Sequence, residues 1–355
     1  MKLAILCDTH HGLRNASDIF LDYTEAFYRD IMFPYCEEHK IKDILHLGDF
    51  FDNRKYVNIK VLNRTRKMFL EPMTEKKMFM TIIPGNHDVM FKHSNEINSL
   101  KEVLGYFKKN VRIVMQPEVK KFGSLPIALL PWIAPDNQKA SIEFINSCPA
   151  PILAGHLEMK GFEMIKGLPV SQHGLEAGAF KRFEAVYSGH YHTRSSRGNI
   201  HYLGTQFEHT WSDCGDPKYF HILDTETREL TKIVNPKTIF HKFQYDDELP
   251  DLFEKTDFSK AKDSYIKIIV INKSDAAKFD SFLTKINQMS PIDVKIIETF
   301  DEFTASAVSD ETVSLEDTHK LLDSYIEAVD TDLDKGRLKR LIQELYIEAQ
   351  QTDTQ

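Results

Sequence analysis

The feature that most constrains this chain is a pattern repeated through its first 192 residues, in which a short polar cluster directly follows an apolar run. Apolar runs of about four or five residues, stopped by Gly or a carboxylate, are typical of strands buried on both faces of a parallel sheet. Side chains that follow such strands meet at the carboxyl edge of the sheet, where ligands bind. The pattern therefore predicts an α/β fold with one shared site. The clusters are Asp8-Thr9-His10, Gly48-Asp49-Phe50-Phe51-Asp52, Gly85-Asn86-His87-Asp88, Gly155-His156 and Gly189-His190-Tyr191-His192.

The apolar runs before the clusters predict strands at residues 3–7, 44–47, 80–83, 151–154 and 185–188. Between these strands, apolar residues at helical spacing predict helices over residues 17–39, 58–70 and 95–109. Further apolar runs at 200–203 and 218–223, with a turn at 224–227, predict hairpins that complete a sandwich.

The side chains of the clusters suit a pair of divalent metal ions. Asp49 is the candidate bridge, because a carboxylate shared between two metals uses both of its oxygens. Imidazole, amide and carboxylate together suit Mn²⁺, Fe²⁺ or Zn²⁺, so we expect Mn²⁺, with Mg²⁺ as the alternative for part of the site. Two such cations favour an anionic phosphodiester and lower the pKa of bound water. The expected ligands are Asp8, His10, Asp49 and His192 for one metal, and Asp49, Asn86, His156 and His190 for the other.

The order of the motifs, D-x-H, GD-xx-D, GNHD, GH and GH-x-H, resembles that of the calcineurin-like metallophosphoesterase family. Within the family, the chain is similar to the SbcD-like nuclease subunits of double-strand-break repair complexes, including the recombination endonuclease subunits of large phages. The resemblance spans residues 1–240. It implies a four-layer α/β/β/α sandwich and a Mn²⁺-dependent DNA exonuclease or endonuclease that hydrolyses phosphodiester bonds with a hydroxide activated by two metals.

The resemblance also implies a catalytic role for His87 of the GNHD motif, which faces the scissile phosphate in relatives without holding a metal. It would stabilise the developing charge or protonate the leaving oxygen. Asp52 and Asp88 are neighbours that would orient His87 or the metal waters. Many relatives carry His at the position of Asp52, so a second-histidine role is not carried over. Basic residues after the motifs are either phosphate contacts or ordinary solvated bases. They are Arg14, Arg54, Lys55, Arg194 and Arg197.

The remaining histidines are expected to have structural or surface positions. His46 lies within a buried strand and is expected to be a core histidine. His11 is expected to be exposed and structural, with substrate contact as the alternative. His173 and His209 lie in loops after ligand strands, so a substrate-facing role stays open for both. The others lack ligand spacing and are expected at the surface: His39, His93, His221, His241 and His319.

The charge of the chain is unevenly distributed. The net charge is −8, but residues 298–335 hold 12 acidic and two basic residues of the totals of 53 and 45. The remainder, with 41 acidic and 43 basic residues, need not repel DNA. The four cysteines lack paired spacing, which indicates reduced thiols. No apolar run has the length of a signal or a membrane span. We therefore expect a cytoplasmic protein, without a membrane partner, of a bacterial or phage-infected cell.

After about residue 240 the composition changes, and residues 265–271, 275–289 and 294–297 predict a βαβ unit. We expect a nuclease domain at 1–240, an α/β capping domain at 241–300, a linker at 301–314 and a helical tail at 315–355. The resemblance implies that the capping domain helps to discriminate DNA ends, the alternative being a structural appendage. It implies that the tail binds an SMC-like ATPase subunit of the SbcC type, the alternative being that the tail folds back on this chain.

The resemblance further implies a homodimer within a heterotetramer, formed by the helices after the GNHD motif, although a core-facing stripe explains their pattern equally well. Three classes of function remain open: a DNA nuclease subunit, a stand-alone phosphomonoesterase or protein phosphatase, and a non-catalytic scaffold. Such phosphatases typically carry GD-xx-DRG, whereas this chain has Asp52-Asn53-Arg54-Lys55. The intact ligand set argues against a scaffold.

Overall fold

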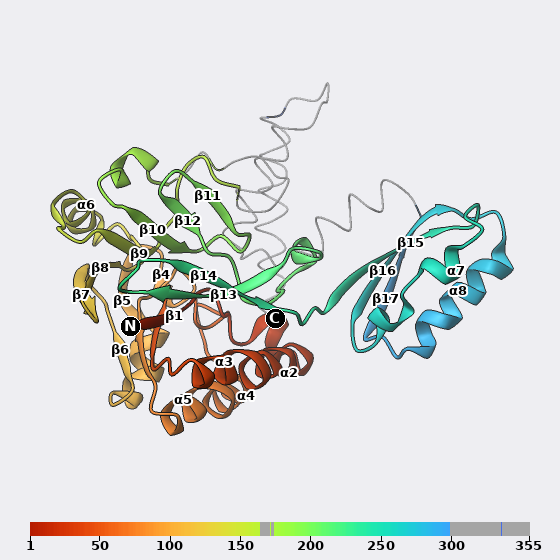
Figure 1. Ribbon diagram of the computed structural model, residues 1–355, viewed down its shortest axis with the longest axis horizontal. Coiled ribbons are helices and arrows are strands. Elements are labelled where there is room, and N and C mark those ends of the chain that lie inside the picture. Colours follow the sequence, from red (N-terminus) through yellow and green to blue (C-terminus); the bar gives the residue numbers. More distant parts are fainter. Residues whose placement is uncertain (164–170, 172–173, 299–334, 336–355) are drawn as a thin grey trace. The chain divides into compact units, whose positions relative to one another are not determined.

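The computed structural model describes residues 1–163, 171, 174–298 and 335. Its first large sheet has the order β14-β13-β1-β2-β3-β6 (Figure 1). The strands β1, β2, β3 and β6 run parallel, while β13 pairs antiparallel with both β1 and β14. The strands of this sheet are β1 (Lys2–Leu6), β2 (Asp43–His46), β3 (Phe79–Ile82), β6 (Val111–Ile113), β13 (Lys218–Asp224) and β14 (Leu230–Asn235).

The second large sheet has the order β11-β12-β10-β9-β8-β7, with parallel strands at its centre and antiparallel ones at both edges. Its strands are β7 (Glu118–Phe122), β8 (Leu125–Leu130), β9 (Ile152–His156), β10 (Ala185–Gly189), β11 (Ser195–Arg197) and β12 (Ile200–Tyr202). The five strands predicted before the polar clusters are thus confirmed as β1, β2, β3, β9 and β10. The predicted runs at 200–203 and 218–223 form β12 and β13, each in an antiparallel hairpin: β12 with β11, and β13 with β14 after the predicted turn.

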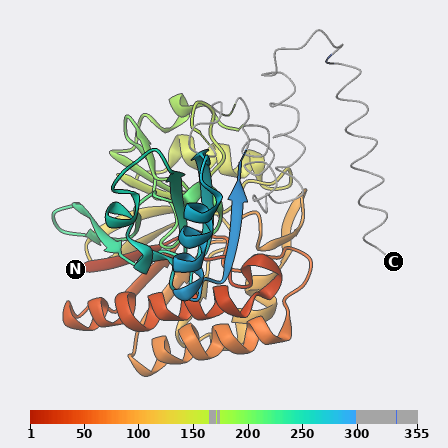
Figure 2. The ribbon, with the colours of Figure 1, turned by 90° about the vertical axis from the view of Figure 1, so that its right-hand side faces the viewer.

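Helices cover the outer faces of both sheets. The helix α2 (Asp18–Phe27) continues through a π-helical turn into α3 (Phe33–Glu38), and α4 (Ile59–Thr65) continues in the same way into α5 (Glu71–Glu75). The two helical segments lie side by side along one face of the first sheet, in red and orange (Figures 1 and 2). On the second sheet, α6 (Gln138–Ser147) packs against the outer face. The helices predicted over 17–39 and 58–70 are confirmed.

Alternating side chains of the strands divide the core into layers. Leu3 and Ile5 pack between the two sheets, whereas Ala4 and Leu6 of the same strand pack against the helices. On the far side, Leu153 of β9 packs with Ile145 of α6. Burying each such aliphatic side chain is worth about 1.5–3 kcal/mol. The described chain therefore forms the expected four-layer α/β/β/α sandwich.

A third sheet follows the sandwich in the sequence and has its own core. Its parallel strands are β15 (Phe240–Asp246), β16 (Tyr265–Asn272) and β17 (Asp293–Ile297), and its helices are α7 (Leu252–Lys255) and α8 (Ala276–Gln288). Tyr245, Ile268 and Phe282 are buried together in this core. The predicted βαβ unit is confirmed, but it gains β15, a strand that the sequence did not predict at the start of the capping domain. The predicted domain boundaries remain predictions.

The segment after the GNHD motif differs from the prediction. Instead of one helix over 95–109, the chain forms a hairpin of β4 (Val89–Phe91) and β5 (Ser94–Asn98), and only then a π-helix (Leu100–Leu104). Ile97, counted in the apolar stripe, is 46% exposed. The side chain of Asn98 accepts the backbone N–H of Lys101 at 2.9 Å, so it caps the helical turn and ends the strand.

Shorter helical turns complete the description. They are α1 (Leu13–Ala16), the π-helical turns Tyr28–Met32 and Arg66–Leu70, and the 3₁₀ turns Gly105–Phe107, Ala177–Phe180, Trp211–Asp213 and Phe258–Ala261. The predicted linker at 301–314 and the helical tail at 315–355 lie outside the described residues, Lys335 excepted. In the described part of the chain, no helix is both long and apolar enough to cross a membrane.

Candidate metal centre

The polar clusters meet where the strands of both large sheets end. Asp8 and Asp49 follow β1 and β2, Asn86 follows β3, and His156 and His190 stand at the ends of β9 and β10. Four of the expected ligands have a left-handed backbone, which turns each side chain sharply away from its strand. Backbone strain of this kind clusters at functional sites. These residues are Asp8 (φ 50°), His10 (φ 42°), Asp49 (φ 54°) and His190 (φ 88°).

Two glycines allow the backbones to approach closely at this edge. A Cβ atom on Gly48 would lie 2.7 Å from Nδ1 of His156, and one on Gly85 would overlap the Asp49 carboxylate. Gly48 also has a φ of 95°, which a side chain would strain. The glycines of the GD and GNHD motifs are therefore required for Asp49 and His156 to come together.

One group of expected ligands surrounds Asn86. Its Oδ1 lies 2.9 Å from Nε2 of His156 and 3.0 Å from Nδ1 of His190. Oδ2 of Asp49 lies 3.3 Å from the same His156 nitrogen. Nδ1 of His156 donates to the carbonyl oxygen of Leu47 at 2.7 Å, which fixes the ring and directs Nε2 into the group.

The other group lies on the opposite side of Asp49. Oδ2 of Asp49 is 3.6 Å from Nε2 of His10, and the ring centroids of His10 and His192 are 5.0 Å apart. Both oxygens of Asp8 accept the backbone N–H of His190, at 2.9 and 3.1 Å. The same oxygen of Asp49 thus faces an imidazole of each group, whereas both oxygens were expected to be used; Oδ1 instead accepts the backbone N–H of His87.

Burial and neighbouring charges of opposite sign together set which residues of this site are protonated. Burial alone would raise the pKa of Asp49, but the positive charges of His156, His87 and His10 hold it well below its usual range. Although burial opposes it, the carboxylate of Asp49 raises the pKa of His156 to about 9. Burial raises the pKa of Asp8 to about 6. In contrast, burial lowers the pKa of His192 to about 3, so that imidazole is neutral.

The donor set fits divalent cations. The ligand atoms are nitrogens and oxygens, some neutral and some charged. Sulfur is not among them, because the nearby thiol of Cys7 donates to the carbonyl oxygen of Gly204 at 2.9 Å. The ring nitrogens of the buried His10 make no hydrogen bond of good geometry and face carboxylate oxygens of Asp52 and Asp49 at 3.3 and 3.6 Å. Buried polar groups without partners are uncommon unless an ion or water completes them. A cation would compete with protons for these lone pairs.

His87 lies beside the site and is only half-buried. Its ring Nδ1 donates to the backbone carbonyl of Asp52 at 2.7 Å, and its backbone N–H donates to Oδ1 of Asp49 at 2.8 Å. The imidazole meets the ring of His10 edge to face at 4.7 Å. Asp52 also places Oδ1 3.3 Å from Nδ1 of His10. The backbone of Asp52 therefore orients His87, while its carboxylate faces a candidate ligand.

Asp88 holds two motif loops together. It is completely buried, and its carboxylate oxygens accept only from backbone N–H groups among the hydrogen bonds described for it. The donors are Asp49 (2.8 Å), Phe50 (3.0 Å), Phe51 (3.3 Å) and Gly85 (2.9 Å). Burial, with the negative charge of Asp49, raises the pKa of Asp88 to about 7. These contacts position the loops of Asp49 and Asn86, and a direct part in turnover stays a prediction.

The basic residues proposed for phosphate contact have differing surroundings. The guanidinium of Arg14 lies over the rings of Phe20 and Phe240, at 5.3 and 5.2 Å from their centroids. Arg14 belongs to α1, where three consecutive residues have positive φ. The others lie at the surface or are half-buried, and their contact with DNA stays a prediction. Lys55, Arg194 and Arg197 are exposed, and Arg54 is half-buried.

Several histidines differ from the expectation. His46 is a core histidine as predicted, but His11 and His221 are buried rather than exposed. His11 bonds the carbonyl of Phe50 at 2.8 Å and the hydroxyl of Tyr28 at 3.1 Å, so its role is structural. His173 lies outside the described residues.

Sequence reasoning left a substrate-facing role open for His209 but did not group it with the expected ligands. His209 is buried, and its ring nitrogens lie within 4.8 Å of the ligand atoms of His10 and His192. The available signal was a further apolar run, 200–203, that is stopped by Gly204 and followed by a histidine a few residues later.

The chain is similar to several known proteins. The family model described as calcineurin-like phosphoesterase matches residues 1–194. Exonuclease subunit 1 of Enterobacteria phage T4 is 29% identical over 354 residues, which cover 99% of this chain and 100% of that protein. A solved structure of an archaeal phosphodiesterase covers 66% of this chain and 100% of its own, at 15% identity and a TM-score of 0.35.

Proposed function

The chain belongs to the calcineurin-like phosphoesterase family, and from this premise we propose that it is a metal-dependent nuclease that hydrolyses the phosphodiester bonds of DNA. The observation that carries the proposal is Asp49, whose Oδ2 faces His10 in one ligand group and His156 in the other. The similarity to an exonuclease subunit over nearly its whole length supports DNA as the substrate.

Two divalent cations, Mn²⁺ foremost, would occupy the two groups. When bound, such a pair supplies a hydroxide nucleophile near neutral pH and offsets the charge of the phosphodiester. The residues that would hold them are Asp8, His10, Asp49 and His192 for one cation, and Asp49, Asn86, His156 and His190 for the other.

The protein's own residues would do the remaining work. His87 is held at its Nδ1 by the carbonyl of Asp52, so its Nε2 is the atom left to meet the substrate. From there it would stabilise charge on the phosphate or, when protonated, donate a proton to the leaving oxygen. Asp88 keeps the loop of His87 at a fixed distance from Asp49 through its backbone bonds to both loops.

We also propose that the chain works as the nuclease subunit of a complex with an SMC-like ATPase that processes DNA ends in recombination and double-strand-break repair. The T4 protein's own description as a subunit supports this assignment. Residues 315–355 would bind the ATPase, the sheet of β15–β17 would help to select DNA ends, and two copies would pair within a heterotetramer. The complex would act in the cytoplasm, where its DNA substrate lies.

A direct comparison of substrates tests the nuclease proposal. The full chain, loaded with Mn²⁺, is given labelled duplex DNA or p-nitrophenyl phosphate. We expect cleavage of the DNA and little release of nitrophenol, and we expect the Asp49→Ala variant to lose both Mn²⁺ binding and DNA cleavage. Rapid hydrolysis of the small ester with intact DNA would instead identify a stand-alone phosphomonoesterase.

A further inference from the structure

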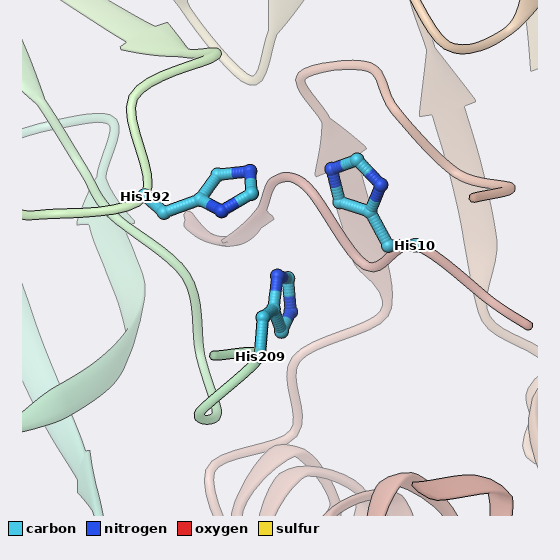
Figure 3. Close-up of side chains that lie close together, drawn as sticks. All are labelled: His10, His192 and His209. Carbon is cyan, nitrogen blue, oxygen red and sulfur yellow. The ribbon is translucent and has the colours of Figure 1, made fainter. Parts of the chain in front are cut away.

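A third imidazole stands beside His10 and His192. His209 follows β12, so the three histidines come from different loops, and Figure 3 shows their rings pointing toward one another. The ring centroid of His209 lies 5.3 Å from that of His10 and 4.9 Å from that of His192. One ligand atom from each of the three lies within 4.8 Å of the other two. Three imidazoles at this spacing resemble the nitrogen set of a single cation.

His209 has no other use for its nitrogens in the described chain. It is 1% exposed, and neither ring nitrogen has a hydrogen-bond partner. Two other buried histidines are satisfied at one or both nitrogens, His46 by Thr9 and His11 by Phe50 and Tyr28. Because an unsatisfied buried polar group is costly, a complete imidazole left in this way indicates a missing ligand.

The chain fixes the position of His209 through a buried ion pair. The carboxylate of Asp213 accepts the backbone N–H of His209 at 2.8 Å and pairs with Lys218. The ammonium of Lys218 donates to the backbone carbonyl of His192 at 3.3 Å. Asp213 and Lys218 are both almost completely buried. One ion pair therefore ties the main chains of His192 and His209 to each other.

The residue on the other side of His209 in the sequence is anchored as well. Oε2 of Glu208 accepts the backbone N–H groups of Ile239 and Phe240, at 2.6 and 3.0 Å. With Glu208 held there and His209 held by Asp213, the intervening backbone is fixed at both ends. The fold thus holds the backbone that carries this imidazole beside His10 and His192.

We propose that His209 is an additional ligand of the cation assigned to Asp8, His10, Asp49 and His192, an inference that rests on the metal site proposed above. This cation then takes three imidazoles, while the other takes two imidazoles and an amide. Imidazole ligands suit Fe²⁺ and Zn²⁺ better than Mg²⁺, which prefers oxygen ligands. The position at His209 would hold one imidazole more than the other position, so it is expected to disfavour Mg²⁺ more strongly.

The test measures Mn²⁺ binding by the full chain from the electron paramagnetic resonance signal of the free ion. We expect two Mn²⁺ per wild-type chain, and at least about 10-fold weaker binding of one of them in His209→Ala and His209→Gln. His10→Ala serves as the positive control. His221→Gln is the matched control, because His221 is also buried with an unpartnered ring nitrogen but lies within β13. Circular dichroism checks that each variant folds.

A second readout counts nitrogen ligands directly. The electron spin-echo modulation of bound Mn²⁺ is expected to show one imidazole nitrogen fewer in His209→Gln than in wild type and no change in His221→Gln. Added imidazole is expected to restore Mn²⁺ affinity in His209→Ala by entering the vacated space. If the His209 variants bound Mn²⁺ with wild-type affinity and showed the wild-type number of nitrogen ligands, the ligand role of His209 would be wrong. The proposed metal site itself would still stand. A wild-type chain that binds no Mn²⁺ would overturn the proposed metal site together with that ligand role.

Discussion

At the scale of single residues, the site depends on how completely Asp49 is constrained. Its backbone N–H donates to Asp88 at 2.8 Å, and its Oδ1 accepts the backbone N–H of His87 at 2.8 Å. These bonds leave Oδ2 to face His10 and His156. A carboxylate fixed in this way loses little conformational freedom when cations bind. Most of the entropy of ordering this side chain is therefore lost on folding rather than on cation binding.

The separate positions of His87 and Asp49 lead to a prediction about His87→Asn. The variant is expected to bind Mn²⁺ as wild type does, because the carboxylates and the other imidazoles remain. Its DNA cleavage rate should fall about 100- to 10,000-fold, the usual range for a lost proton donor or charge-stabilising group. Parallel Mn²⁺ titrations and single-turnover cleavage measure the two effects.

One outcome would change the role of His87. Its ring nitrogens lie within 4.8 Å of ligand atoms of His10 and Asp49, so a ligand role is geometrically open. If His87→Asn lost a Mn²⁺ ion together with its activity, His87 would have to be reassigned as a ligand. Asp49→Ala provides the comparison for a variant that loses both.

The sequence predicted which residue types form the site, but it predicted less well which histidines are buried and which of them lie at the site. Asp8, Asp49 and His156 could be found because each stands directly after a buried apolar run. The local mark is weaker for His209, which stands five residues beyond Gly204, and the ion pair of Asp213 and Lys218 ties its loop to the main chain of His192. Such placement depends on tertiary contacts, which local patterns do not encode.

At the scale of elements, the strand β13 carries a buried histidine with a consequence for stability. Burial lowers the pKa of His221 from 6.5 to about 3, helped by the charges of Arg194 and Lys232. The folded chain therefore binds this proton less readily than the unfolded chain does. The stability that neutral His221 contributes is present above pH 6.5 and is lost as the pH falls toward 3.

We predict that His221→Gln makes the protein less sensitive to acid. Between pH 7 and pH 5, the wild type should lose roughly 2 kcal/mol more unfolding free energy than the variant, because only the wild type must hold this imidazole neutral. Urea unfolding at both pH values measures the difference. His39→Gln is the control, since His39 is exposed, and it should follow the wild type. Equal acid sensitivity in His221→Gln and wild type would contradict the assigned cause.

Strands that are buried on both faces could be predicted from the sequence. β1, β2 and β3 could be located from their continuous apolar runs, since no other regular element of that length suits such a run. β15 was missed because half of its residues are polar or charged. β12 and β13 were located, but the sequence did not show that β12 also pairs with β10 and β13 with β1. Strand pairing over such distances is decided by the whole core rather than by the local turn.

At the scale of the whole molecule, the family region is not a complete structural unit. The family model ends at residue 194, whereas the first sheet takes β13 and β14 from residues beyond that point. β13 pairs directly with β1, the strand that leads to Asp8, and its first residue, Lys218, holds His192. The metal centre therefore depends on the segment from 195 to 235 for both its sheet and its ligand positions.

The C-terminal tail, by contrast, is expected to be separable from catalysis. The strands described for both large sheets lie between residues 2 and 235, and residues 315–355 contain no expected ligand. Their sequence has two apolar stripes at helical spacing, which include Leu322, Ile326, Leu338 and Leu345 and which suit docking in an apolar groove of a partner. We predict that deleting 315–355 leaves Mn²⁺-dependent cleavage of duplex DNA within about 3-fold of wild type, the ordinary scatter between variants of unchanged mechanism.

The same deletion should end co-purification with the SMC-like ATPase when the two proteins are expressed together. Replacing Leu338 and Leu345 with Asp in the full chain is expected to have the same effect, because a buried carboxylate would be costly in an apolar groove. Replacing Glu344 and Gln350 with Ala in the same segment is the matched control and should leave the complex intact. Co-purification of the shortened chain would show that the ATPase binds elsewhere, and loss of DNA cleavage would show that the tail supports the sandwich instead.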